Sequence, residues 1–140
     1  MKAILATVAI FFMMLASPPM SLAADETANK VVIQVSDNDP AKWNLALNNA
    51  KNIQEELGKA NVKIEIVAYG PGINMLKFDS QVGNRLAEAT NNGVFIAACA
   101  NTMKAQKLAP EDMHPAAKIV PAGVVEIIKR EREGYAYIRP

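Results

Sequence analysis

The sequence predicts an α/β domain of doubly wound type, with a mainly parallel five-stranded sheet and helices on both faces. Short apolar, β-branched runs alternate along the chain with amphipathic segments, which is typical of strand–helix–strand units. The connections between consecutive apolar runs are too long for hairpins, so the strands should be parallel. A length of 140 residues fits one domain once any targeting segment is set aside.

The first strand and helix are predicted over residues 31–59. Residues 31–35 are β-branched and almost wholly apolar, as in a buried central strand. Asp39 and Pro40 then supply an N-cap and a first helical residue. From residue 41 to residue 59 the apolar side chains recur at three- and four-residue spacings. This spacing predicts an amphipathic helix that covers the sheet.

The later elements follow from the same two patterns, short apolar runs for strands and amphipathic stretches for helices. They are a strand over 62–68, a short helical turn over 73–78, a helix over about 80–90, a strand over 94–98, a helix from Asn101 or Thr102, a strand over 118–120, a helix over 124–132 and a strand over 135–138.

Residues 1–23 have the pattern of a cleavable secretory signal peptide. Lys2 precedes an apolar run over 3–16, and Ser21 and Ala23 form a small-x-small motif. We expect cleavage after Ala23, which leaves a single domain over residues 24–140. The apolar run is shorter than the roughly 20 residues that span a bilayer. We therefore expect a periplasmic or secreted protein with no stable membrane anchor.

The charge balance argues against a nucleic-acid partner. The chain carries 15 Lys and Arg residues and 14 Asp and Glu residues. Cleavage after Ala23 removes one lysine and no acid, so the mature domain is close to neutral. It lacks the basic stripe that binds phosphate backbones.

Three loops, over residues 36–38, 69–72 and 99–102, are expected to meet at one edge of the sheet. Ligands of parallel sheets bind outside the carboxyl ends of the strands, and each of these loops follows a predicted strand. Glycines in the second loop allow a close approach of the backbone. The candidate ligand-binding residues are Tyr69, Gly70, Gly72, Asn101 and Thr102.

Cys99 is the candidate catalytic residue and the only cysteine of the chain. It stands between a predicted strand and a predicted helix, where free backbone N–H groups can lower a thiol pKa below about 8.5. The alternatives are a buried cysteine that acts as a small hydrophobe and a thiol that pairs with another chain. The sequence leaves these readings open.

Metal, cofactor and nucleotide sites are not indicated, and we expect none. His114 is the only histidine, and one Cys with one His falls far below the usual zinc ligand set. The Gly70-Pro71-Gly72 loop lacks the pattern of a phosphate loop. His114 lies in a predicted loop, where we interpret it as a surface residue, and a Cys–His nucleophile pair is the alternative.

Three stretches of the sequence carry a resemblance to a known family. They are Val67 to Ile73, Gly93 to Met103, and Pro121 to Glu126 continued by Gly134 to Pro140. In their order they resemble the DsrE/DsrF-like family of small sulfur-handling proteins, over nearly the whole domain. The resemblance implies a three-layer, flavodoxin-like α/β fold and an assembly of identical chains into a trimer or hexamer.

In active members of that family, a cysteine in the loop after a central strand accepts sulfane sulfur as a persulfide, and Cys99 occupies the matching position. The resemblance also implies a protein that donates or accepts the sulfur. Well-known relay members work in the cytoplasm, so the export signal suggests sulfur transfer outside it and makes a tRNA role doubtful. Ile73, Met75 and Leu76 are either interface residues or part of the core.

The resulting hypothesis is an exported sulfane-sulfur carrier or sulfurtransferase-like protein that uses Cys99. One alternative is a noncatalytic oligomeric module that holds a small ligand or partner at the same edge. Another is a redox-responsive protein that dimerises through Cys99, which requires an exposed thiol.

Overall fold

A computed structural model describes residues 28–140, and the expected signal peptide lies outside the described residues. The described chain forms one five-stranded sheet in the order β4-β3-β2-β1-β5. Every pair of neighbouring strands is parallel, which confirms the predicted fold class. None of the helices in residues 28–140 has the length and apolar character needed to cross a membrane.

The elements alternate between strands and helices or turns, as the sequence pattern predicts. In chain order they are β1 (Asn29–Val35), α1 (Pro40–Leu57), η1 (Lys59–Asn61), β2 (Val62–Ala68), η2 (Gly70–Leu76), α2 (Gly83–Asn91), β3 (Phe95–Cys99), α3 (Ala100–Ala105), η3 (Pro110–Asp112), β4 (Lys118–Val120), α4 (Gly123–Arg132) and β5 (Ala136–Ile138).

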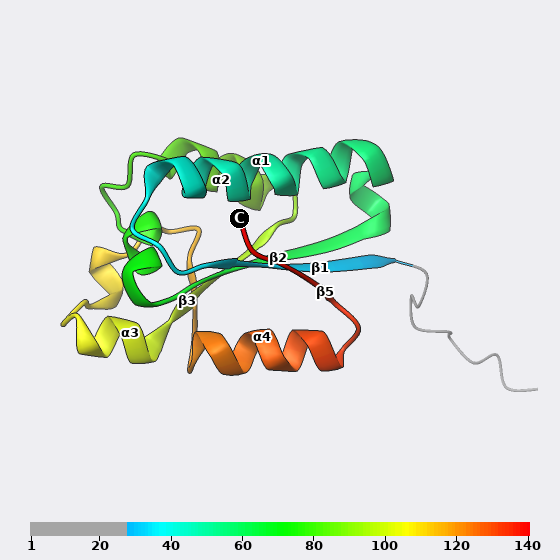
Figure 1. Ribbon diagram of the computed structural model, residues 1–140. Helices are drawn as coiled ribbons and strands as arrows, with labels where there is room; N and C mark the ends of the chain where they lie inside the picture. The colour runs from blue at the N-terminus through cyan, green and yellow to red at the C-terminus, as the bar shows by residue number, and fades with distance from the viewer. Residues whose placement is uncertain (1–27) are drawn as a thin grey trace, which may run out of the picture.

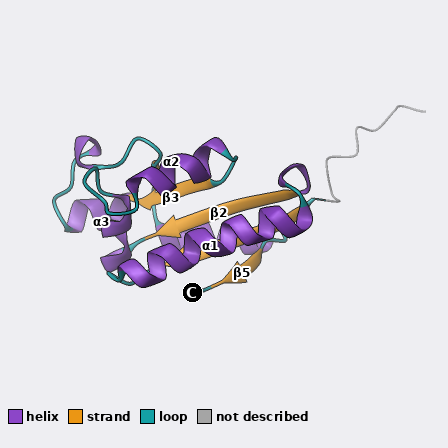
Figure 2. Ribbon diagram, turned by 90° about the horizontal axis from the view of Figure 1, so that it is seen from above, coloured by secondary structure: helices purple, strands orange, loops and turns teal. Residues whose placement is uncertain are grey.

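The helices form layers on both faces of the sheet (Figure 1). Helices α1 and α2 cover one face, and α4 crosses the opposite face. The view from above shows α1 and α2 in front of the strands (Figure 2). Strands β1 to β4 succeed one another in one direction across the sheet, whereas β5 returns to the far side of β1. A right-handed connection from β4 to β5 therefore places α4 on the other face.

The two faces have apolar clusters of very different size. The cluster under α1 and α2 contains wholly buried side chains such as Ile33, Ile66 and Leu86. The cluster under α4 is small and includes Val67 and Ile127. Burial on the first face therefore provides most of the hydrophobic stabilisation.

Helix α1 has the predicted N-cap but ends two residues earlier than predicted, at Leu57. The Asp39 carboxylate accepts a hydrogen bond of 2.8 Å from the N–H of Ala41, the expected N-cap. Gly58 ends the helix with a φ of 84°, a conformation that glycine adopts without steric cost.

Several predicted boundaries shift in the structure, among them those of β3, α3 and α2. Strand β3 includes Cys99, which pairs with Val120 of β4. Helix α3 therefore starts at Ala100 rather than at Asn101 or Thr102. Helix α2 starts at Gly83 because its N–H first closes a turn onto the carbonyl of Ser80, at 2.9 Å.

The short helical turn after β2 begins earlier than predicted and forms the 3-10 element η2. Ile73, Met75 and Leu76 are each 0% exposed within the single chain. Their side chains belong to the core under α1 and α2. The core reading of these residues is therefore correct, and an interface role for them is wrong.

Candidate functional site

The loops that follow β1, β2 and β3 meet at the carboxyl edge of the sheet, as expected. The N–H of Gly72 donates to the carbonyl of Ser36 at 3.2 Å. The N–H of Gly70 donates to the Thr102 hydroxyl at 2.9 Å. The side-chain amide of Gln106 also donates to the carbonyl of Gly70 at 3.2 Å. The side chains of Thr102 and Gln106 therefore hold the loop over residues 69–72 in place.

Cys99 lies at the centre of this edge, at the end of β3, and is 5% exposed. Burial raises the pKa of its thiol, because the charged thiolate loses contact with water. Four donors oppose this effect: the Thr102 hydroxyl and the backbone N–H groups of Gly123, Thr102 and Asn101. Together they hold the pKa of Cys99 below its ordinary value, so the site favours the nucleophilic thiolate.

Gly123 is a residue of the candidate site that the sequence did not indicate. Its N–H faces the sulfur of Cys99 from the start of α4. A Cβ atom at this position would lie 2.9 Å from Cβ of Tyr69 and 3.3 Å from Cβ of Cys99. Only glycine allows α4 to begin this close to the thiol. The sequence showed only a glycine at the start of a predicted helix. That glycine indicates a contact with Cys99 only once β4 is known to pair with β3, because this pairing brings the start of α4 to the thiol.

Tyr69 is half-buried and lies beside Gly123, at the same edge of the sheet as Cys99. Burial raises the pKa of its phenol, Tyr137 adds to the rise, and Arg139 opposes it. Arg139 lies 3.9 Å from a carboxylate oxygen of Asp37. A hydrogen bond from Lys42 holds the pKa of the partly exposed Asp37 carboxyl below its usual range. Arg139 and Tyr137 reach this edge because β5 pairs with β1.

The other predicted ligand-binding residues have distinct structural positions. Gly72 is buried, and a Cβ atom there would lie 2.3 Å from the carbonyl oxygen of Val35, so this glycine allows two loops to close. Gly70 has a φ of 54° and open space around its Cα. Asn101 is exposed, and its N–H also donates to the carbonyl of Pro121 at 3.3 Å.

His114 is built into a loop away from the groups that surround the sulfur. Its N–H donates to the carbonyl of Leu76 at 2.8 Å, and its Nδ1 accepts from the N–H of Ala116 at 3.2 Å. Its ring lies beside Gly83. Within residues 28–140, no group of three or more His, Cys, Asp or Glu side chains could hold a metal ion.

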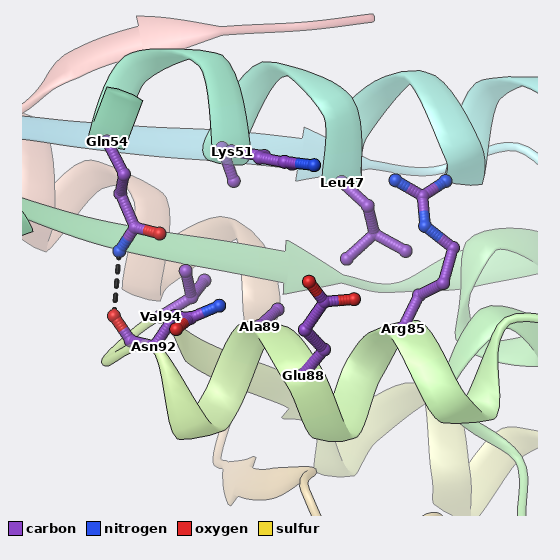
Figure 3. A pocket seen from close by; sticks show the side chains of 9 residues that line it. Leu47, Lys51, Gln54, Arg85, Glu88, Ala89, Asn92 and Val94 are labelled. Carbon is purple, nitrogen blue, oxygen red and sulfur yellow. Dashed lines mark hydrogen bonds between the residues drawn. The ribbon is translucent and has the colours of Figure 1, made fainter. Parts of the chain in front are cut away.

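A small hollow lies between α1 and α2 (Figure 3). Its floor contains Leu47 and Val94, and Arg85 and Glu88 of α2 point toward α1. Gln54 closes one end by donating to the carbonyl of Asn92 at 2.8 Å. The residues that line it include neither a cysteine nor a histidine.

Replacement of Gly123 tests whether α4 must begin against the thiol. Gly123→Ala should lower the free energy of unfolding by about 1–3 kcal/mol, because the new Cβ overpacks the backbone-proximal atoms of Tyr69 and Cys99. Gly83→Ala is the matched control at the first residue of α2, where the new Cβ would lie 3.5 Å from the His114 ring, an ordinary contact. Urea unfolding measures the free energy of unfolding of both variants. Equal values for Gly123→Ala and Gly83→Ala would contradict this account.

Replacement of Thr102 tests the hydroxyl that faces the sulfur. Thr102→Val removes a donor to the thiolate and the acceptor of the Gly70 N–H. We therefore expect the pKa of the Cys99 thiol to rise and the free energy of unfolding to fall by about 1 kcal/mol. Thr102→Ser keeps the hydroxyl and should retain both properties. The rate of alkylation by iodoacetamide against pH measures the pKa without ambiguity, because the chain has one cysteine.

The same groups predict a pH dependence of stability. Because the pKa of Cys99 is lowered in the folded chain, the free energy of unfolding should rise between that pKa and the unfolded value of about 8.5, and stay high above it. The rise should be smaller in Thr102→Val and absent in Cys99→Ser. An equal rise in all three proteins would assign it to other groups.

The sequence and the fold were compared with known proteins. Residues 29–140 match the model of the DsrE/DsrF-like family. No curated protein matched this chain. A solved protein of unknown function, MTH1491 from Methanobacterium thermoautotrophicum, shares 36% sequence identity with a TM-score of 0.76, over 80% of this chain and 99% of that one.

Two further solved structures show the same fold at low identity. BT1422 from Bacteroides thetaiotaomicron, a conserved protein of unknown function, has a TM-score of 0.65 at 16% identity, over 80% of this chain and 95% of its own. The ychN protein from E. coli has a TM-score of 0.66 at 10% identity, over 81% and 99%. From the match over residues 29–140 and the identity with MTH1491, this chain belongs to the DsrE/DsrF-like family.

Proposed function

We propose that this protein is an exported sulfane-sulfur carrier in which the Cys99 thiolate accepts the sulfur atom as a persulfide. One observation carries the proposal: a hydroxyl and three backbone N–H groups converge on the lone thiol of a chain from this family. A thiolate is the form of cysteine that attacks sulfur. The arrangement stabilises the charge where the reaction needs it.

The step needs no added oxidant or cofactor. With thiosulfate as donor, the Cys99 thiolate attacks the outer, sulfane sulfur, and a bond forms between Sγ and that sulfur. The bond between the two thiosulfate sulfurs breaks, and its electron pair leaves with sulfite. The product is a persulfide anion, which the N–H groups around Cys99 can also stabilise through charge-assisted hydrogen bonds. A thiol of an acceptor protein would then remove the sulfur.

The burial of Cys99 favours small donors. With 5% of the residue exposed, a thiosulfate or polysulfide ion needs only a narrow path to the sulfur, whereas a disulfide between two chains needs both cysteines at the surface. The reading of Cys99 as an exposed thiol for redox dimerisation is therefore wrong. The proposal is consistent with a protected thiol that reacts with selected donors.

Intact-mass spectrometry tests the proposal directly. The protein is incubated with thiosulfate or with polysulfide, and we expect a mass gain of about 32 Da for one sulfur atom. The gain should disappear after treatment with a reductant, because a persulfide is reducible.

Cys99→Ser is the matched control and should gain no mass. An unchanged mass for the native chain with both donors, despite alkylation of its thiol by iodoacetamide, would overturn the proposal. That result would favour the alternative function, a noncatalytic module that binds a small ligand or partner at the same edge.

We also propose that the chain assembles with copies of itself, as a trimer or hexamer. The outer surface of α4 supports this proposal, because Val124, Val125 and Ile128 are 52%, 62% and 43% exposed on neighbouring turns of the helix. Adjacent exposed apolar side chains mark interaction surfaces. Helix α4 is also the only long helix on its face of the described sheet (Figure 1).

Light scattering after size-exclusion chromatography tests the assembly. We expect the native chain to be larger than a monomer and Val125→Glu to be smaller, because a buried unpaired carboxylate is costly at an interface. Phe78→Glu is the control, since Phe78 is 70% exposed on the loop after η2, away from α4. A monomeric native chain, or equal effects of both variants, would contradict the proposal.

A further inference from the structure

A cluster of charged side chains anchors the C-terminal half of α4 to the sheet. The guanidinium of Arg130 contacts Glu65 of β2 through Nε, Glu126 through Nη2 at 3.0 Å and Glu133 through Nη1 at 2.8 Å. The ring of Tyr135 lies with its centroid 5.5 Å from the Arg130 guanidinium carbon. A single arginine therefore joins one strand carboxylate to two carboxylates of the helix and its end.

Glu65 depends on this arginine more than a surface carboxylate would. It is 2% exposed, and its Oε1 atom has no hydrogen-bond partner among the described residues. Burial raises the pKa of this carboxyl, and the charge of Arg130 acts in the opposite direction. A buried carboxylate that loses its partner is strongly unfavourable, so Glu65 holds Arg130 in place on β2.

The two ends of α4 lie beside Glu65 of β2 and Tyr69, the residue that follows β2. Gly123 and Arg130 are seven residues apart, about 10 Å along a helix, and both face the sheet. Their partners Tyr69 and Glu65 are four residues apart, about 13 Å along a strand. Ile127 lies between the two contacts and belongs to the same apolar cluster as Val67.

We propose that Arg130 is a positioning residue for Cys99: its contact with Glu65 fixes α4 on β2, so that the N–H of Gly123 stays directed at the sulfur. A role of Arg130 in activity rests on the proposed function. The position of the Gly123 N–H, which Arg130 is proposed to set, can be tested without that function. Arg130 itself acts only through the helix and does not touch the thiol.

The charge-conserving variant Arg130→Lys is the primary test. A lysine keeps the positive charge but lacks the planar fork that contacts three carboxylates at once. We expect the thiol pKa of Cys99, read from the pH dependence of alkylation, to rise by about 0.5 of a unit as the Gly123 donor loosens. An unchanged thiol pKa in this variant overturns the proposal.

Arg130→Met is the stronger variant and should raise the thiol pKa by about one unit. Arg132→Met is its control, because it removes the same charge from an exposed position in the same turn of α4. Subtracting the control removes the long-range effect of the lost charge. Equal shifts in the two variants overturn the proposal. If Arg130→Met does not fold, Arg130→Lys and Glu65→Gln, which preserve the volume, decide the question by the same readout.

The alkylation readout separates this inference from the proposed function, because it needs no sulfur donor. A raised thiol pKa in the Arg130 variants supports the positioning role even if the native chain accepts no sulfur. Sulfur uptake by the native chain with an unchanged thiol pKa in the variants overturns the positioning role and leaves the carrier function standing.

Discussion

The contact of α4 with β2 is the interaction on which the site depends. The helix covers its face of the sheet over a small apolar cluster, so its alignment rests on a few specific contacts. At one end Gly123 packs against Tyr69 and Cys99, and at the other Arg130 pairs with Glu65. The glycine contact and the buried ion pair each define the position of the helix along the sheet.

The thiol environment is a balance between two opposing effects. Burial of Cys99 disfavours the thiolate, and four hydrogen-bond donors more than offset that effect. Three of these donors are backbone N–H groups, which carry no flexible side chain and lose little entropy when they bind a charge. The site therefore stabilises a negative sulfur by the geometry of the main chain, with one adjustable group, the Thr102 hydroxyl.

The sequence predicts the sheet and the loop of the thiol because both depend on local patterns. The strands over 62–68 and 118–120 have the expected ends, since short apolar runs between turn residues define them. Gly123 and Arg130 could not be assigned, because their roles depend on which strands are neighbours. Apolar and charged side chains alternate over residues 62–66, a pattern that predicts an exposed Glu65. Glu65 is buried because α4 lies over β2.

The proposed assembly and the proposed chemistry meet on α4. Val124 and Val125 are exposed directly after Gly123, whose N–H faces the thiol. A second copy packed on these valines would contact the end of the helix that supplies the donor. Gly123 packs against Tyr69 and Arg130 pairs with Glu65. These two contacts would keep α4 in position against such a neighbour. Self-association could then proceed without displacing the Gly123 N–H from the sulfur.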